Sequence, residues 1–334
     1  MVEREEVRVE VDGRVLTLTS LSKVLYPRTG MTKGEVLNYY AQVAPALLPQ
    51  LQDRAVTRIR WPHGVGDMSF FEKNAPAGTP SWVRTVIVPT TGSRTADHRE
   101  GTLTFPILDS LAALTWAANL SALELHVHQW TVGGDGTPAG ANRIVIDLDP
   151  GEPAGLQECC EVALLVREAL AARDLPATPV LSGSKGLHLY AALPEPVEPD
   201  VATALAKEIA EDLQKAHPRK VTATMTKSRR SGKVFLDWSQ NSGSKTTICP
   251  YSLRGKATPT VAAPVTWDEV SEGAEDPLGI DQLGPNDVIT RLSERGISSQ
   301  ALRGCNYCSL HVELRACRRR PRGHRCSPGA HAPA

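Results

Sequence analysis

The stretch RIVIDLD, residues 143–149, decides the fold. Its apolar run predicts a buried β-strand that ends in two acidic residues. Residues i and i+2 of a strand point to the same face of a sheet, so Asp147 and Asp149 project together. Two neighbouring carboxylates repel each other beside a core unless a cation lies between them, and hard divalent cations such as Mg²⁺ or Mn²⁺ meet that need. Two solvated acids at a strand end are the alternative interpretation.

The segments after this strand alternate between helical and strand patterns. Apolar spacing and flanking turn residues predict helices over residues 153–173 and 200–217, and strands over residues 178–184, 187–193 and 233–238. The resulting β-α-β-β-α-β order predicts an α+β fold built on a ferredoxin-like (RRM-like) split βαβ unit. The antiparallel sheet of such a unit carries helices on one face and leaves the other open for a site.

The strand order of that unit brings a third acid to the pair. The first strand lies between the third and the fourth, so Asp237, in VFLDWS at 234–239, is expected beside Asp147 and Asp149. Three carboxylates converging from adjacent strands suit a two-metal phosphoryl-transfer site, with the ions about 3.5–4 Å apart. A helix cap or a surface acid is the alternative role for Asp237.

The segment SGSKGLHLY, residues 182–190, combines a flexible turn, two hydroxyls and an ammonium group. Ser182, Lys185 and the turn amides suit phosphate oxygens, and His188 lies on the strand that follows. The segment is not a P-loop, because the G-x-x-x-x-G-K-[ST] spacing is absent. A hairpin turn with a structural histidine is the alternative.

A second polar segment, SQNSGSKTTICPYSLR, occupies residues 239–254. Its Gln240, Lys245 and Arg254 add polar and cationic groups that suit a triphosphate leaving group. A solvated loop is the alternative.

Cationic and aromatic residues interleave in the first part of the chain. The cations are Lys23, Lys33, Arg58, Arg60 and Lys73, and the aromatic residues are Trp61, Phe70 and Phe71. Cations on phosphates combined with stacking rings hold frayed or single-stranded nucleic-acid ends. Adjacent strand residues face opposite ways, so we expect one of the two phenylalanines to be buried and the other exposed; both in the core is the alternative. A basic loop at 227–230 precedes Asp237, and a solvated turn is the ordinary role of such a run.

Composition limits the class of protein. The chain has 334 residues, 41% hydrophobic and 22% charged, and no segment reaches about 20 uninterrupted apolar residues, so we expect no membrane span. The N-terminus is too charged for a signal peptide, which predicts a cytoplasmic protein. Residues 303–334 hold seven Arg and one acid, leaving 30 bases against 36 acids, about −6, on residues 1–302. Nucleic-acid binding must therefore rest on local basic clusters.

The predicted organisation is one large domain followed by a tail. Residues 1–302 divide into an N-terminal α/β part (1–140), a central core (141–255) and a helical extension (256–302). Residues 303–334 form a Cys- and Arg-rich tail, which we predict to be disordered. A zinc site made by its Cys and His residues, or a frame-shifted end, are the alternatives.

The ordered motifs closely resemble the polymerase domain of bacterial ligase D, of the archaeo-eukaryotic primase superfamily, which acts in non-homologous end joining. The resemblance covers about residues 14 to 297. Its motifs are KVLYP (23–27), RWPHG (60–64), FFEKNAP (70–76), ELHVHQW (124–130), DLDP (147–150), SGSKGLHLY (182–190), FLDWSQNSGSKTT (235–247) and YSLRG (251–255).

The resemblance implies a role for each matching residue. Asp147, Asp149 and Asp237 would ligate two divalent cations, with Mn²⁺ favoured and Mg²⁺ as the alternative. The incoming nucleotide would meet Ser182, Lys185, His188 and Arg254 at its triphosphate, His126 at its sugar, and Gln240 and Lys245 nearby. The DNA would meet Lys23 and Lys33 at a 5′-phosphate, Phe70 and Phe71 at the template, and Arg230 in a loop that orders the site.

The implied activity is template-directed addition of nucleotides, with NTPs preferred over dNTPs, to 3′ ends at gaps and overhangs. The implied partners are DNA ends with a 5′-phosphate, Ku and, because the K-x-D-G nucleotidyl-lysine motif is absent, a separate ATP-dependent DNA ligase; the implied location is the nucleoid. Three alternatives stay open: a primase that starts RNA chains de novo, a non-catalytic DNA-end-binding module, and a metal-dependent nuclease or phosphatase.

Overall fold

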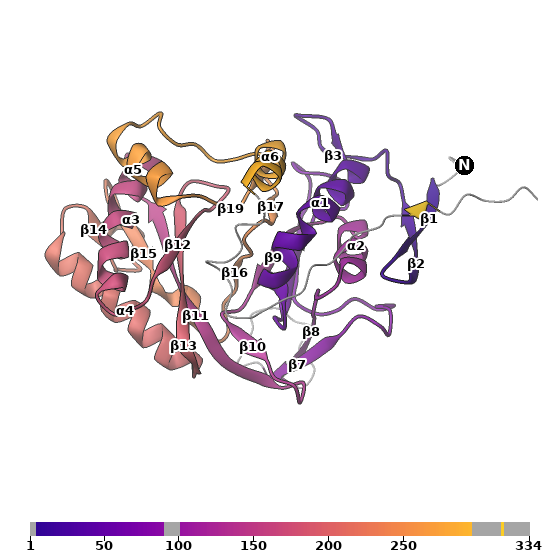
Figure 1. The fold of residues 1–334 in the computed structure, drawn as a ribbon, viewed down its shortest axis with the longest axis horizontal. Helices are drawn as coiled ribbons and strands as arrows, with labels where there is room; N and C mark the ends of the chain where they lie inside the picture. Colours follow the sequence, from indigo (N-terminus) through magenta and orange to yellow (C-terminus); the bar gives the residue numbers. More distant parts are fainter. Residues whose placement is uncertain (1–4, 90–100, 296–314, 317–334) are drawn as a thin grey trace, which may run out of the picture.

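A computed structural model describes residues 5–89, 101–295 and 315–316 of this mixed α/β chain (Figure 1). Most of the predicted tail at 303–334 therefore lies outside the described residues. Its Arg315–Ala316 form strand β20, which pairs with β1 (Glu6–Val11). No helix in the described part of the chain is long and apolar enough to cross a membrane.

A seven-stranded sheet forms the centre of the molecule. Its path is β14-β15-β11-β13-β12-β19, and β10 pairs with β11 off this path. The strands are β10 (Trp130–Val132), β11 (Pro138–Pro150), β12 (Ala177–Leu181), β13 (Leu187–Val197), β14 (Val221–Thr222), β15 (Val234–Asp237) and β19 (Ala263–Pro264). Strand β11 therefore lies between β13 and β15, as the sequence predicts. Strands β10, β14 and β19 are additions to the predicted set.

The alternation of side chains along β11 divides the sheet into two faces. Ile144, Ile146 and Leu148 are fully buried in the core formed with the helices. Val145 packs in a separate small cluster, and Asp147 and Asp149 follow it at period two. The predicted strand thus buries one row of side chains and turns its acidic row the other way.

Helices α3 (Leu156–Ala171) and α4 (Pro199–Ala216) cover one face of this sheet, as predicted. Their apolar side chains, including Cys160, Val166, Ile209 and Leu213, belong to the same core cluster as β11. Figure 1 shows both helices on the side of the sheet away from α1 and α2. The opposite face is therefore left for the acidic row.

The N-terminal part has its own sheet, in the order β16-β9-β5-β6, and two helices. The strands are β5 (Val56–Arg60), β6 (Phe70–Glu72), β9 (Ala122–Val127) and β16 (Thr247–Ile248); the helices are α1 (Lys33–Leu51) and α2 (Leu111–Asn119). Thr32 caps α1 in a capping box with Glu35, which explains where the helix begins.

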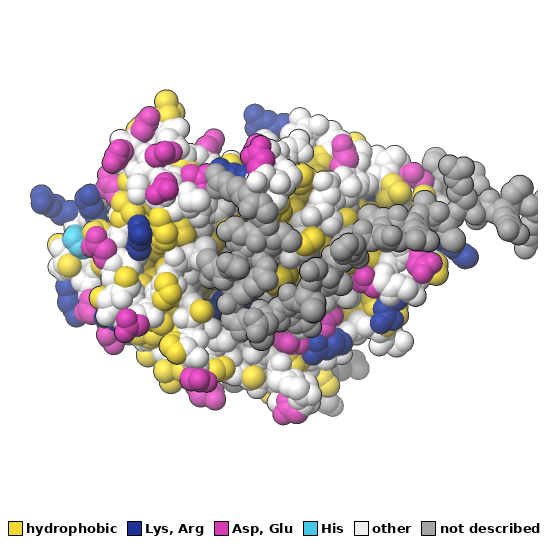
Figure 2. All heavy atoms as spheres, viewed as in Figure 1, with side chains coloured by type: hydrophobic (Ala, Val, Ile, Leu, Met, Phe, Trp, Pro, Cys, Tyr) yellow, Lys and Arg dark blue, Asp and Glu magenta, His cyan; other side chains and the backbone are white. Residues whose placement is uncertain are grey.

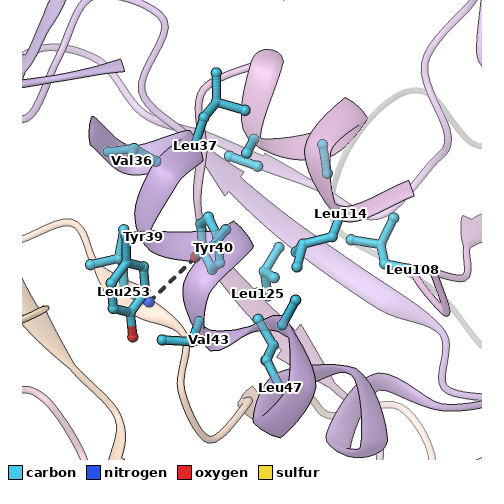
Figure 3. Packing of buried hydrophobic residues seen from close by; sticks show 14 of the residues in the cluster. Val36, Leu37, Tyr39, Tyr40, Val43, Leu47, Leu108, Leu114, Leu125 and Leu253 are labelled. Atoms are coloured by element: carbon cyan, nitrogen blue, oxygen red, sulfur yellow. Dashed lines mark hydrogen bonds between the residues drawn. The ribbon is translucent and has the colours of Figure 1, made fainter. Parts of the chain in front are cut away.

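Helix α1 ties this part to a distant segment of the chain. Val36, Tyr40, Val43 and Leu47 belong to one buried cluster with Leu114 of α2 and Leu125 of β9, as Figure 3 shows. The Tyr40 hydroxyl also accepts a hydrogen bond from the Leu253 amide at 3.3 Å. The strand that carries Arg254 is thereby held against the N-terminal core.

Short hairpins and a C-terminal extension complete the described fold. The hairpins are β1 with β2 (Arg14–Thr19), β3 (Val24–Tyr26) with β4 (Met31–Thr32), β7 (Thr85–Pro89) with β8 (Thr102–Pro106), and β17 (Leu253–Arg254) with β18 (Thr260–Val261). The first hairpin turns at Asp12 and Gly13, which both have positive φ, as is typical of a two-residue hairpin turn. The extension contains α5 (Trp267–Glu275) and α6 (Pro285–Arg295).

Charge is mixed on the face of the molecule seen in Figure 2. Asp and Glu side chains are interspersed with Lys and Arg, and the described residues visible there form no continuous basic surface. This agrees with the near-zero net charge of the whole chain. A polyanion that binds this face must therefore be bound by a local cluster of basic side chains.

Candidate active site

A cavity of about 350 Å³ opens at the acidic row of β11. It lies between the central sheet and the N-terminal sheet, because strands of both contribute to its lining. The predicted residues that line it are His126, Asp147, Asp149, Ser182, Lys185, His188, Asp237, Gln240 and Arg254. Nine of the ten residues predicted to bind metal or nucleotide are therefore brought together. Ser184, which carries the second hydroxyl of the 182–190 segment, also lines it, as do Thr246 and Thr247, for which no role was predicted.

The three aspartates come from two adjacent antiparallel strands. Asp147 of β11 is paired in register with Asp237 of β15, and Asp149 follows two residues later. Directly opposed residues on one face have Cβ atoms about 4.5–5.5 Å apart. The predicted convergence of the three acidic positions is thus observed.

Each carboxylate contacts a protein group. Asp147 Oδ1 lies 3.2 Å from His188 Nε2, and Asp149 Oδ2 lies 3.4 Å from Arg230 Nη1. Asp237 accepts hydrogen bonds from the Ser239 amide and hydroxyl and from Gln240 Nε2. With the side chains in these positions, the described residues contain no group of three or more Asp, Glu, His or Cys that could hold a metal ion.

The donor chemistry and the charge of the site nevertheless fit a hard cation. Burial, followed by the negative charge of Asp147, raises the pKa of Asp149, while Arg230 acts in the opposite direction. The carboxylates therefore lack full compensation of their charge. Carboxylate oxygens on one open face are the ligands that Mg²⁺ and Mn²⁺ prefer.

The turn at 182–186 has a tightly built backbone. Ser182 Oγ accepts hydrogen bonds from the Ser184 and Gly186 amides, both at 3.2 Å, so its own O–H remains a donor for a ligand. A Cβ at Gly186 would lie 1.9 Å from the Leu148 carbonyl oxygen. Glycine is therefore required where the turn crosses β11.

A buried carboxylate behind the cavity connects two of the predicted nucleotide contacts. Glu124 Oε2 lies 2.8 Å from His126 Nε2, and Glu124 Oε1 lies 3.5 Å from Arg254 Nε and accepts the Gly255 amide at 2.9 Å. Glu124 stands in the quoted motif ELHVHQW, but nothing in its spacing shows that it contacts Arg254, which lies 130 residues away.

Lys245 is the predicted nucleotide contact that does not line the cavity. Its Nζ donates a hydrogen bond to the Ser239 hydroxyl, which in turn donates to Asp237. Lys245 is therefore connected to Asp237 through Ser239, a residue with no predicted role.

The two lysines predicted to hold a 5′-phosphate lie next to each other. The Lys33 amide donates to the Lys23 carbonyl oxygen at 2.8 Å. Lys23 Nζ donates to the Pro62 carbonyl oxygen, whereas Lys33 is only 4% exposed and its Nζ donates to the Thr19 carbonyl oxygen at 2.6 Å. The backbone thus brings both residues together at the start of α1.

The expected division of Phe70 and Phe71 between core and surface is wrong. Both are exposed, 42% and 58%, because the three-residue strand β6 is the edge of its sheet. Arg58, by contrast, is fully buried, with Glu72 at 3.5 Å and its guanidinium over the Trp116 ring. Of the predicted cationic and aromatic surface, Arg58 is therefore part of the core, and so is Trp61.

Arg230 lies beside the acidic row, in the loop where the sequence places it. It follows the short helix η1 (Lys227–Arg229), and its guanidinium lies over the Phe235 ring at 3.6 Å. Gly151 contacts this loop so closely that a Cβ there would lie 2.1 Å from the Arg230 carbonyl oxygen.

Comparison with known proteins shows which protein family this chain resembles. A family model described as "LigD, primase-polymerase domain" matches residues 32–297. The multifunctional non-homologous end joining DNA repair protein LigD of Mycobacterium tuberculosis is 49% identical over 286 residues, covering 84% of this chain and 36% of that protein. The bifunctional LigD of Bacillus subtilis is 34% identical over 282 residues, covering 84% of this chain and 43% of that protein. The chain thus spans less than half the length of these relatives.

A solved structure agrees with the sequence matches. The polymerase domain from Mycobacterium tuberculosis ligase D, in complex with DNA, matches with a TM-score of 0.78 and 49% identity, over 84% of this chain and 95% of that one. The fold and these matches define the class of protein as a primase-polymerase domain. More closely, the chain belongs to the LigD primase-polymerase domain family, as the motifs in the sequence predict.

Proposed function

We propose that this chain is a metal-dependent, template-directed nucleotidyltransferase that adds nucleotides, preferably NTPs, to 3′ ends at gaps and breaks during non-homologous end joining. One observation carries the proposal. A single cavity has Asp147, Asp149 and Asp237 on its wall together with Ser182 and the other hydroxyl, ammonium, imidazole and guanidinium groups suited to a triphosphate.

The central sheet fits a ferredoxin-like split βαβ unit of the primase type. The strand order β15-β11-β13-β12, with α3 and α4 as the two connections, supports this assignment. Such a sheet leaves its second face open, and the cavity occurs on that face.

Asp147, Asp149 and Asp237 would hold two divalent cations, with Mn²⁺ preferred and Mg²⁺ as the alternative, once the side chains exchange their protein partners for the ions. Bound there, the ions would lower the pKa of the primer 3′-hydroxyl and neutralise the departing pyrophosphate. The chain itself would supply orientation, because its aspartates come from two hydrogen-bonded strands that fix their spacing.

The remaining wall of the cavity would bind the nucleotide. Ser182, Lys185, His188 and Arg254 would contact the triphosphate, and His126 would contact the sugar. Gln240 would contact the nucleotide directly, and Lys245 would act near it. The free O–H of Ser182 and the cationic groups support this division, because phosphate oxygens accept hydrogen bonds and attract positive charge.

DNA would approach from the N-terminal part of the molecule. Lys23 and Lys33 would hold the 5′-phosphate of a gap or overhang, Phe70 and Phe71 would stack on template bases, and Arg230 would order the site. The exposure of both phenylalanines supports the stacking role. The related Mycobacterium tuberculosis polymerase domain in complex with DNA supports a DNA ligand.

In the cell, the chain would act at broken DNA in the cytoplasm, at the nucleoid. Ku would bring the ends, and an ATP-dependent DNA ligase activity would seal the nick that remains. The repair names of the LigD relatives support this setting.

The test is extension of a labelled, 5′-phosphorylated gapped DNA with Mn²⁺ and either NTP or dNTP. We expect template-matched addition, faster with NTP, and none after chelation with EDTA. A parallel reaction with an unprimed template separates primed extension from de novo priming, since products from it would show a primase. Tight binding of the DNA without any nucleotide incorporation would indicate a non-catalytic end-binding module. Release of mononucleotides would indicate a nuclease.

A further inference from the structure

Glu124 is a buried acid with no place in the lining of the cavity, yet it contacts two residues that line it. The residue is 5% exposed, on β9. Its two oxygens meet His126 on one side and Arg254 with the Gly255 amide on the other. Burial acts to raise the pKa of Glu124, but the hydrogen bond with His126 and the charge of Arg254 outweigh it, and the pKa is lowered. Glu124 is therefore ionised at neutral pH.

The ionised state of Glu124 decides which nitrogen of His126 carries the proton. An ionised carboxylate only accepts hydrogen bonds, so Nε2, at 2.8 Å from Glu124, must be the N–H donor. Burial lowers the pKa of His126, and Arg254 and His188 act in the same direction although Glu124 opposes them. A neutral ring with Nε2 protonated has a bare Nδ1, which is a hydrogen-bond acceptor.

Nothing in the described part of the chain donates a hydrogen bond to Nδ1 of His126. The ring also lines the cavity. Nδ1 is thus the nitrogen left for a ligand, and its natural partner is a hydroxyl donor. A nucleotide carries such donors on its sugar, whereas its phosphates offer only acceptors at neutral pH.

We propose that Glu124 is a positioning and specificity-determining residue, which fixes His126 as the Nε2–H tautomer so that Nδ1 accepts a hydrogen bond from a sugar hydroxyl of the bound nucleotide. This inference rests on the proposed nucleotide site. It adds a residue outside the lining of the cavity, which determines through His126 how the sugar of the nucleotide is recognised.

The substitution Glu124→Gln tests the tautomer directly. The Gly255 amide requires an acceptor at the Oε1 position, so the new side chain must place its carbonyl oxygen there. Its NH₂ group then faces His126 Nε2, which has to become the acceptor. The ring consequently shifts to the Nδ1–H tautomer and presents a donor to the cavity instead of an acceptor. Volume and shape are almost unchanged.

Two measurements follow from this. ¹⁵N NMR of the histidine rings, with the His126 signals assigned by their loss in His126→Gln, is expected to show Nε2–H in the wild type and Nδ1–H in Glu124→Gln. Incorporation opposite a gapped template is compared for NTP and for its 2′-fluoro and 3′-fluoro analogues, which cannot donate at the changed position. We expect the wild type to prefer the hydroxyl over fluorine at one position by roughly tenfold in kcat/KM, and the variant to lose that preference.

The outcomes separate this inference from the proposed function. An Nδ1–H ring in the wild type overturns the inference, and so does a Glu124→Gln variant that keeps the hydroxyl preference. A wild type that incorporates no nucleotide contradicts the proposed function instead, and the tautomer measurement on the free protein still decides the role of Glu124. Glu269→Gln, in α5, is the matched control. It also removes a carboxylate paired with an arginine, Arg291, but Glu269 lies far along the chain from His126. If the Glu124→Gln variant has a lowered melting temperature, the ¹⁵N NMR spectrum of the wild type still tests which tautomer His126 adopts.

Discussion

Asp147 and Asp237 are direct cross-strand partners, one on β11 and the other at the last residue of β15. Their side chains lie on the face of the sheet opposite the helical core, and Asp149 follows at the next position on that face. Like charges placed opposite each other weaken a sheet. An arrangement that costs stability and faces a cavity is typical of a functional site.

Replacing either cross-strand acid is expected to abolish nucleotide addition. Asp147→Asn and Asp237→Asn should each lower incorporation at a Mn²⁺-supplied gap at least a hundredfold, because the proposed cations lose a charged ligand. Melting temperatures should stay level or rise, since like-charge repulsion is removed. Binding of the gapped DNA without nucleotide should persist. Asp212→Asn on α4 serves as the control, and wild-type rates in either site variant would contradict the metal-site assignment.

The pKa of Asp149 predicts a pH dependence of stability. Burial and Asp147 raise its pKa in the folded state, so the ionised form destabilises the fold above that pKa and the cost disappears as the pH falls through it. Asp149→Asn should therefore raise the melting temperature at pH 7 by about 1–2 °C, a small shift because the side chain is half exposed. The gain should vanish towards pH 4, as thermal melts at a series of pH values would show. If the increase in melting temperature caused by Asp149→Asn became larger as the pH falls, it would contradict a raised pKa of Asp149.

The three aspartates could be predicted to converge because their placement depends on two general rules of strand geometry. Period-two alternation puts Asp147 and Asp149 on one face, and the strand order of the predicted unit brings Asp237 beside them. Both rules need only the pattern within and between neighbouring strands. The same holds for the turn at 182–186, whose Gly and Ser residues mark it.

The residues that were missed or misplaced depend on long-range packing instead. Glu124 meets Arg254 because β9 and the segment after β16 come together across 130 residues, and no local pattern reports that contact. Arg58 was expected at the surface, but β5 lies inside its sheet with Trp116 against the guanidinium. Phe71 is exposed because β6 is an edge strand. Which strand lies at an edge is a property of the whole fold.

Ser239 is expected to tune the metal site without contacting the nucleotide. Its hydroxyl bridges Lys245 and Asp237, so Ser239→Ala should free the Asp237 carboxylate and weaken Mn²⁺ binding about 10- to 100-fold by calorimetry. Added Mn²⁺ should restore the rate, because the three carboxylates remain. Ser271→Ala, which removes a hydroxyl that donates to the Trp267 carbonyl oxygen, is the control. Unchanged Mn²⁺ affinity in Ser239→Ala would exclude this positioning role.

Gly186→Ala is expected to damage the fold at the phosphate turn. The added Cβ would lie 1.9 Å from the Leu148 carbonyl oxygen, so the turn or β11 must move. We expect the free energy of unfolding to fall by about 1–3 kcal/mol, together with a higher KM for the nucleotide. Chemical denaturation measures the first and steady-state incorporation the second.

The matched substitution for this test is Gly134→Ala, where a Cβ meets nothing within 4 Å. It should change stability by less than about 0.5 kcal/mol. Equal losses in the two variants would show that glycine flexibility, and not the crossing of β11, explains the effect.

Phe71 is expected to contribute to binding of the template and not to the core. Its ring is 58% exposed on an edge strand, so Phe71→Ala should leave the melting temperature nearly unchanged. Loss of one base–aromatic stack should weaken binding of a 3′-overhang DNA about tenfold, measured by fluorescence anisotropy at fixed salt. The defect should shrink on an abasic template position, because no base remains to stack. Leu278→Ala, at a side chain 91% exposed in the C-terminal extension, is the control. Full affinity together with a lowered melting temperature would instead make Phe71 a structural residue.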